Sequence, residues 1–198
     1  MIAIVIAGFV GLLGLILVLV VLLVIIIAVV MFNNLVQLRN RVENAWAQID
    51  VQLKRRFDLI PNLIETVKAY AAHEKGTLDA VIQARNSAIS ASAGGSASAA
   101  AAAQADTNLT ASLRQVFALS EAYPDLKANQ NFLALQEELS ATEGKISYAR
   151  QFYNDTVMKY NTKIEQFPTS ILAGIKKMVH REYFQTDEGS REVPKVQF

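Results

Sequence analysis

Apolar and polar positions divide the chain into parts with different periodicity. From Ile2 to Phe32 every residue is apolar or Gly, and the first charged side chain is Arg39. As a helix this run would be about 46 Å long, whereas the hydrocarbon core of a bilayer is about 30 Å thick. We therefore predict a transmembrane anchor at residues 1–32 that crosses a membrane once, with excess length that tilts or protrudes.

A cleaved secretory signal is the alternative interpretation of this run. It fits poorly, because no basic residue precedes the run, the run is about twice as long as a signal core, and no clear A-x-A site follows it. We expect a retained anchor.

After Phe32 the apolar positions take up a helical period, with polar residues on the other faces. They are Leu35, Leu38, Val42, Ala45, Ile49 and Leu53. No Gly or Pro occurs between Gly14 and Pro61, so we expect the membrane helix to continue into the domain. Trp46 would lie about 21 Å beyond Phe32, too far for an interfacial aromatic belt, and is predicted to be in the core.

Proline, glycine and serine predict the next boundaries. Pro61 lacks an amide N–H, so we predict a turn near residues 58–61 with Pro61 early in a second helix. The apolar face of that helix comprises Leu63, Ile64, Val67, Tyr70, Ala71, Leu78, Val81 and Ile82. Residues 86–105 are almost all Ala, Ser and Gly, which indicates a helix connection or a flexible binding loop. Ser96 or Ser98 is expected to cap the helix that follows.

The second half of the chain predicts two further helices. The third has its apolar face at Leu109, Leu113, Val116, Phe117 and Leu119. It should end at Tyr123–Pro124, and Asp125 is expected to cap the fourth helix. The fourth has a heptad-like seam at Phe132, Leu135, Leu139, Thr142, Ile146, Ala149, Tyr153, Thr156 and Tyr160, extended by Ile164 and Phe167.

Four amphipathic helices with short connections predict an all-α fold. We expect a single N-terminal transmembrane helix that continues into an antiparallel four-helix bundle at residues 33–167, built from long helices. Residues 168–198 would form a tail with a short basic amphipathic helix. Its candidate membrane-surface contacts are Ile171, Leu172, Ile175, Lys176 and Lys177. Docking of this helix on the bundle is the alternative.

Small residues recur in the anchor. Ala3, Ala7 and Gly11 are spaced by four, with Gly14 nearby. This spacing lets two membrane helices approach closely, although Gly is common in membrane helices anyway. We take these four residues as candidates for membrane-helix packing.

Charge bears on partners and orientation. The net charge is +1, and no dense basic stripe indicates a nucleic-acid partner. The absence of Cys excludes disulfides and thiolate metal sites. Basic residues follow the anchor, starting with Arg39 and Arg41, so the N-terminus is predicted outside and the domain in the cytoplasm.

The sequence contains no recognisable catalytic or metal motif. A di-iron bundle needs Glu-x-x-His on two helices, but the two histidines, His73 and His180, lack it. No phosphate-binding loop, dinucleotide fingerprint or nucleophile elbow occurs. We predict no catalytic residue, no metal and no cofactor. One alternative is a polar pocket at Tyr153, Asn154, Tyr160 and Asn161, where Tyr153 and Tyr160 are otherwise seam residues.

Three segments of the chain resemble the LemA family. They are residues Leu35 to Glu74, residues Tyr123 to Asn161, and the stretch FPTSILAG at 167–174. Gly144 departs from the family pattern, which usually has Asn there. The resemblance implies a bacterial inner-membrane protein with an N-terminal membrane helix and a cytoplasmic antiparallel four-helix bundle. It supplies no established reaction or cofactor.

Three functions follow as hypotheses. The leading one is a non-enzymatic scaffold or interaction protein of the cell envelope, anchored in the lipid bilayer and forming a homo-oligomer. The second is a regulatory or sensory partner of another membrane protein, such as a protease or transporter. The third is an enzyme with an unfamiliar site.

Overall fold

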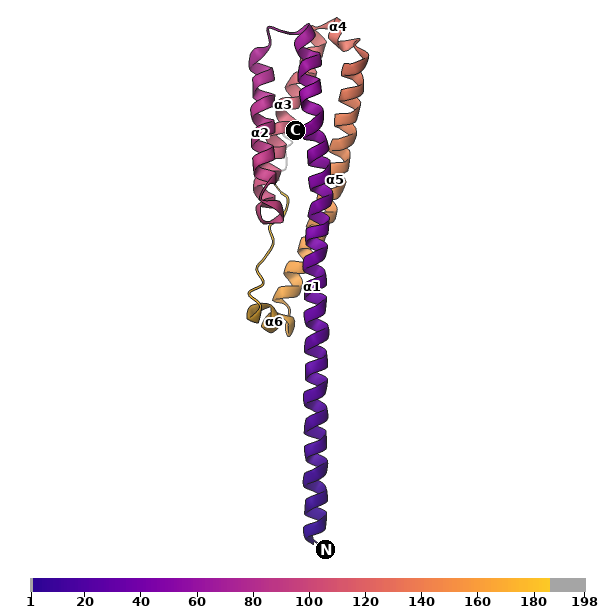
Figure 1. Cartoon of the computed structure of the whole chain (residues 1–198), viewed down its shortest axis with the longest axis vertical. Helices are drawn as coiled ribbons and strands as arrows, with labels where there is room; N and C mark the ends of the chain where they lie inside the picture. The colour runs from indigo at the N-terminus through magenta and orange to yellow at the C-terminus, as the bar shows by residue number, and fades with distance from the viewer. Residues whose placement is uncertain (1, 186–198) are drawn as a thin grey trace, which may run out of the picture. The chain divides into compact units, whose positions relative to one another are not determined.

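The computed structural model describes residues 2–185, with side chains from Gly11 onward, and every regular element in that range is helical (Figure 1). The elements are α1 (Ile2–Tyr70), α2 (Lys75–Ser92), the 3-10 helix η1 (Gly95–Ser98), α3 (Ala99–Ala122), α4 (Pro124–Lys127), α5 (Gln130–Glu165) and α6 (Thr169–Ile175). The predicted all-helical class is therefore confirmed.

The chain forms two compact units. The first contains α1 up to Asn40 together with residues Lys159–His180. The second contains residues Arg41–Met158 and the segment that starts at Arg181. Each unit is described by itself below.

The core of the second unit is built from the apolar faces of α1, α2, α3 and α5. On α5 the predicted seam is buried at Phe132, Leu139, Thr142, Ile146, Ala149, Tyr153 and Thr156. Trp46 on α1 is 7% exposed, and its ring lies edge-on to Tyr153 with the ring centroids 5.7 Å apart. It also lies 6.0 Å from the ring of Phe184 in the tail. The prediction that Trp46 is a core residue is confirmed.

The predicted turn at residues 58–61 is wrong. α1 continues through Pro61 to Tyr70, and the chain turns at residues 71–74 instead. In a regular helix the amide of residue 61 would donate to the carbonyl of residue 57, and proline removes that donor. Arg85 on α2 replaces it, because its Nε donates to the carbonyl oxygen of Phe57 over 2.8 Å. A side chain 28 residues further along the sequence thus satisfies the carbonyl of Phe57 that Pro61 leaves free.

The connection between α2 and α3 is shorter than the 20-residue Ala/Ser/Gly stretch suggested. α2 runs to Ser92, and Gly95 adopts a φ of +63°, a conformation that favours glycine. Ser98 occupies the N-cap position of α3 but makes no capping hydrogen bond. The hydroxyl of Ser96 donates to Glu43 instead. The prediction that Ser96 or Ser98 caps the helix with its side chain is therefore wrong.

Two predictions for α5 are also corrected. Asp125 lies inside α4, and the capping residue of α5 is Asn129, whose Oδ1 accepts a hydrogen bond from the amide of Phe132 over 3.0 Å. Phe167, expected to extend the seam, is 82% exposed, because α5 ends at Glu165 and the chain changes direction before Pro168. Ile164 is buried, as expected.

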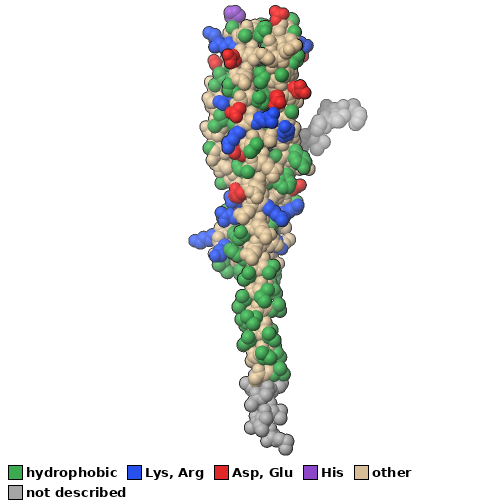
Figure 2. Space-filling view, turned by 45° about the vertical axis from the view of Figure 1, so that its right-hand side comes forward, with side chains coloured by type: hydrophobic (Ala, Val, Ile, Leu, Met, Phe, Trp, Pro, Cys, Tyr) green, Lys and Arg blue, Asp and Glu red, His purple; other side chains and the backbone are tan. Residues whose placement is uncertain are grey.

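In the first unit the side chains of α1 from Gly11 to Ile27 are all exposed to the surroundings. The helix meets the length and composition needed to cross a membrane, with a mean hydropathy of 3.8 in its most apolar window. Figure 2 shows that the side chains of this stretch are hydrophobic and that none of them is charged. Burial begins near Phe32, and Leu35 is fully buried.

Candidate functional site

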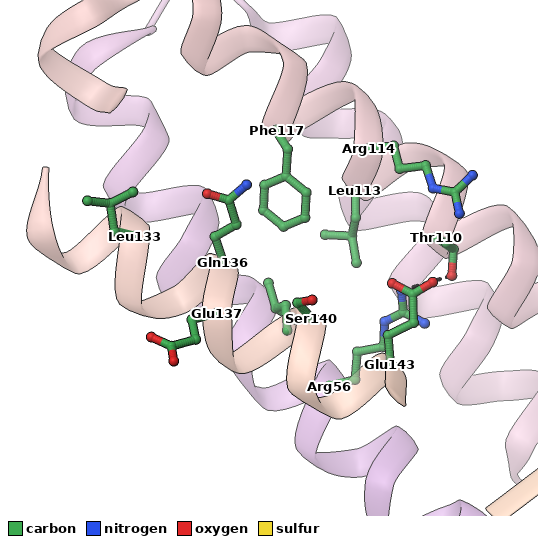
Figure 3. Close-up of a pocket in the computed structure, with 11 residues that line it drawn as sticks. Arg56, Thr110, Leu113, Arg114, Phe117, Leu133, Gln136, Glu137, Ser140 and Glu143 are labelled. Carbon is green, nitrogen blue, oxygen red and sulfur yellow. Dashed lines mark hydrogen bonds between the residues drawn. The ribbon is translucent and has the colours of Figure 1, made fainter. Parts of the chain in front are cut away.

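A polar pocket of about 440 Å³ opens in the second unit, between α1, α3 and α5 (Figure 3). Its lining residues are Arg56, Thr110, Leu113, Arg114, Phe117, Leu133, Gln136, Glu137, Leu139, Ser140 and Glu143. Apolar side chains form part of the wall, and two arginines and two glutamates supply charges of both signs. The pocket therefore has no single-sign field that would select a strongly charged ligand.

Arg56 is the most unusual residue of this pocket, since it is 2% exposed. Its Nη1 donates to Asp106 on α3 and its Nη2 donates to Thr110, each over 2.8 Å. Its Nε is buried and has no hydrogen-bond partner among the described residues. Burial raises the pKa of Asp106, while the neighbouring Arg56 guanidinium opposes that rise.

The hydrogen bonds of Arg56 hold α1 against α3. The hydroxyls in the lining belong to Thr110 and Ser140, and the lining contains no histidine. The hydroxyl of Thr110 is already used, because it donates to the main-chain oxygen of Asp106 over 3.0 Å. We interpret the pair of Arg56 and Asp106 as a buried structural ion pair.

The sequence analysis did not single out Arg56 as a core residue. The signal was present, because Arg56 lies three residues after Leu53 and four before Ile60, both fully buried on the same face of α1. A charged residue at a position of an apolar stripe needs a buried partner. The only missing information was which acidic residue the fold would bring to it.

The alternative of a polar pocket at the Tyr/Asn cluster is wrong. In the second unit Tyr153 is fully buried and its hydroxyl donates to the main-chain oxygen of Glu182 over 2.9 Å. Asn154 holds both main-chain groups of Phe184, accepting from its amide over 2.9 Å and donating to its carbonyl over 3.3 Å. In the first unit Tyr160 donates to the oxygen of Val179 over 3.2 Å. The cluster thus binds the chain's own tail, and burial raises the pKa of Tyr153 to about 12.

Glu43 on α1 joins the same tail to η1. One of its carboxylate oxygens accepts from Arg181 over 2.6 Å, and the other accepts from the hydroxyl of Ser96 over 2.8 Å. Together with Tyr153 and Asn154, this carboxylate fixes residues 181–184 along the second unit. These contacts explain why polar residues occupy positions in and beside the seam.

The candidate residues predicted from sequence lie as follows. Ala3 and Ala7 belong to α1, but their side chains lie outside the described residues. A Cβ added at Gly11 or Gly14 would meet nothing within 4 Å, so this side of α1 is open.

In the tail, Ile171 and Ile175 are 57% and 70% exposed, Leu172 is half-buried, and Lys176 and Lys177 are exposed. Within the described residues no three His, Asp or Glu side chains are grouped in a way that could hold a metal ion.

These features define a class: all-helical proteins whose N-terminal helix is long and apolar enough to cross a membrane. Residues 45–198 match the model of the LemA family. The chain belongs to the LemA family.

The chain is also similar to individual bacterial proteins, at identities below 30%. The chain is 27% identical to protein LemA of Metamycoplasma hominis, over 80% of this chain and 71% of that protein. It is 25% identical to magnetosome protein MamQ 2 of Paramagnetospirillum magneticum and 23% identical to magnetosome protein MamQ of Magnetospirillum gryphiswaldense. Both alignments cover 79% of this chain, and this chain spans 65% of the length of each relative.

Proposed function

We propose that this protein is a non-enzymatic helical scaffold of the bacterial cell envelope, anchored in the lipid bilayer and self-associating. The observation that carries the proposal is the exposed apolar stretch of α1, where no side chain from Gly11 to Ile27 is covered by the rest of the chain. Such a surface needs a lipid or protein environment. The LemA family and the magnetosome protein relatives support a membrane-associated role.

The proposed architecture is an anchor at residues 1–32, an antiparallel four-helix bundle at 33–167 and a tail at 168–198. Contacts within the second unit support the bundle. α1 pairs with α3 through Arg56 and Asp106, α1 with α2 through Phe57 and Arg85, and α3 with α5 through the rings of Phe117 and Phe132. Exposed Arg39 and Arg41 favour a cytoplasmic domain in the inner membrane. Protease protection of the domain in inside-out vesicles would contradict this orientation.

Self-association is supported by surfaces in each unit. In the first, Gly11 and Gly14 leave the helix backbone open to a close neighbour. In the second, a groove of about 670 Å³ lies between α1 and α5 and is lined by small residues and by the exposed side chains of Val51 and Tyr148. Exposed apolar side chains along a groove between helices are suited to receive another helix.

The test is the mass of the full-length protein in native nanodiscs, measured by mass photometry. The proposal expects a discrete multiple of 21.7 kDa. The double variant A7L/G11L should weaken the oligomer, whereas V20L, on the face of the helix opposite to Gly11, should not. A monomer at all protein concentrations would contradict self-association.

The second candidate function is regulation of another membrane protein, and the same groove favours it. Tyr148 is 74% exposed, and the chain has no native Cys, so Y148C provides a single cross-linking site. Oxidative cross-linking in membranes to a product of twice the chain's mass supports the scaffold. A monomeric chain whose Tyr148 position cross-links to one defined membrane protein supports the regulatory function instead.

A further inference from the structure

The short helix α6 presents an uncovered apolar face. Thr169 and Ala173 are buried in the first unit, at 2% and 3% exposure. The opposite side of the helix carries the exposed side chains of Ile171 and Ile175, and Phe167 before α6 and Val179 after it are exposed as well. Their exposed fractions are 57%, 70%, 82% and 67%, so no part of the described chain covers them.

The position of α6 relative to the anchor is given by one contact within the first unit. The Nζ of Lys176 lies 5.3 Å from the centroid of the Phe32 ring. Phe32 is the last residue of the uninterrupted apolar run. α6 therefore lies at the level where the run ends, which is where the headgroups of a bilayer would begin.

The exposed charged side chains next to α6 are mainly basic. Lys176 and Lys177 are exposed directly after α6. The nearby carboxylate of Glu165 is engaged by the imidazole of His180 at 3.2 Å. Isoleucine side chains next to exposed lysines match the apolar and anionic layers of a phospholipid surface.

We propose that α6 is a second membrane contact, which inserts Ile171 and Ile175 into the interface and binds anionic phospholipid headgroups with Lys176 and Lys177. The inference rests on the proposed anchoring of α1. It adds a specific lipid class, and it defines how deeply α1 lies in the bilayer. The 31-residue run exceeds the hydrocarbon thickness, and a contact at α6 determines which residues of the run lie inside the bilayer.

The experiment uses the full-length chain with single cysteines, since none is native. An environment-sensitive fluorophore is attached to I175C, and the protein is placed in nanodiscs of phosphatidylcholine, with or without phosphatidylglycerol. We expect a blue-shifted emission and shielding from aqueous iodide in the anionic discs. The double variant K176Q/K177Q should lower the ratio of docked to undocked α6 about fivefold for each lysine. The matched variant K68Q/K75Q, which removes the same charge from the second unit, should leave it unchanged.

Two further labels separate this inference from the anchor itself. A fluorophore at L22C, inside the apolar run, reports whether α1 is in lipid, and one at Q83C, on the exposed face of α2, gives the reference for an exposed side chain. A lipid-buried L22C with an I175C as exposed as Q83C would overturn the inference and leave the anchor intact. Equal shielding of I175C in neutral and anionic discs would overturn the assignment of anionic lipid. An exposed L22C would refute the anchoring on which both proposals depend.

Discussion

The carbonyl of Phe57 gives the sharpest prediction. It is the acceptor that Pro61 leaves without a helical partner, and Arg85 fills it over 2.8 Å. Removing Arg85 with R85A leaves this oxygen without its donor. Because a hydrogen bond from a charged donor contributes about 1.5–3 kcal/mol, we expect R85A to lower the free energy of unfolding by about that amount.

The variant P61A changes the outcome of the same mutation. An alanine at 61 restores the amide donor to Phe57, and it removes a residue that costs about 3 kcal/mol relative to Ala in a helix interior. P61A should therefore be more stable than the wild type. In the P61A background R85A should cost at least about 1 kcal/mol less than in the wild type, because the carbonyl keeps a donor.

The assay is urea unfolding of the full-length chain in nanodiscs, followed by tryptophan fluorescence. Trp46 is the single tryptophan and is buried in the second unit, so the signal reports this unit. Q83A, an exposed substitution on the same helix as Arg85, serves as the control and should be neutral. If R85A costs the same in both backgrounds within about 0.5 kcal/mol, Arg85 and Pro61 are independent and the explanation of the continuous helix is wrong.

Three further predictions test the buried polar groups and the glycines. D106A should destabilise the second unit by about 3–5 kcal/mol in urea unfolding, because it leaves the Arg56 charge buried and unpaired. A smaller loss would mean that Arg56 reaches water. Burial raises the pKa of Tyr153 to about 12, so this tyrosine should ionise near pH 12 in an ultraviolet titration of the folded protein. The free energy of unfolding should fall as the pH rises from about 10 to 12, since the folded state keeps the proton longer, and Y153F should remove this step. G95A should lower the free energy of unfolding by about 1 kcal/mol, because residue 95 has a positive φ. G144A on α5, where a Cβ meets no atom within 4 Å, should raise it by about 1 kcal/mol.

Much of the fold could be predicted from periodicity. Most of the α5 seam and Trp46 are buried as expected, because a repeated apolar stripe is a local signal that does not depend on the identity of the neighbour. The error at Pro61 involves a partner that is distant in sequence. Pro61 ends a helix unless another element supplies the missing donor, and nothing near residue 61 in the sequence indicates Arg85.

The candidate site was harder to predict for the same reason. Tyr153 and Asn154 could be recognised as polar residues next to an apolar seam, but their partners are main-chain groups of Glu182 and Phe184. Main-chain groups carry no sequence signature, so a pocket and a bound tail could not be distinguished. The same holds for Asp106, one of several acidic residues that could have paired with Arg56.

The contact between Trp46 and Tyr153 also has a consequence for biosynthesis. The two rings pack together although more than 100 residues separate them along the chain. At a translation rate of roughly 5–20 residues per second, the apolar stripe of α1 leaves the ribosome roughly 5–20 s before its partner on α5 is made. With the anchor proposed above, the N-terminal apolar stretch would enter the bilayer during that interval, and the nascent stripe would lie beside a lipid surface. We expect the period between anchor insertion and synthesis of α5 to be the time at which this chain depends most on chaperones.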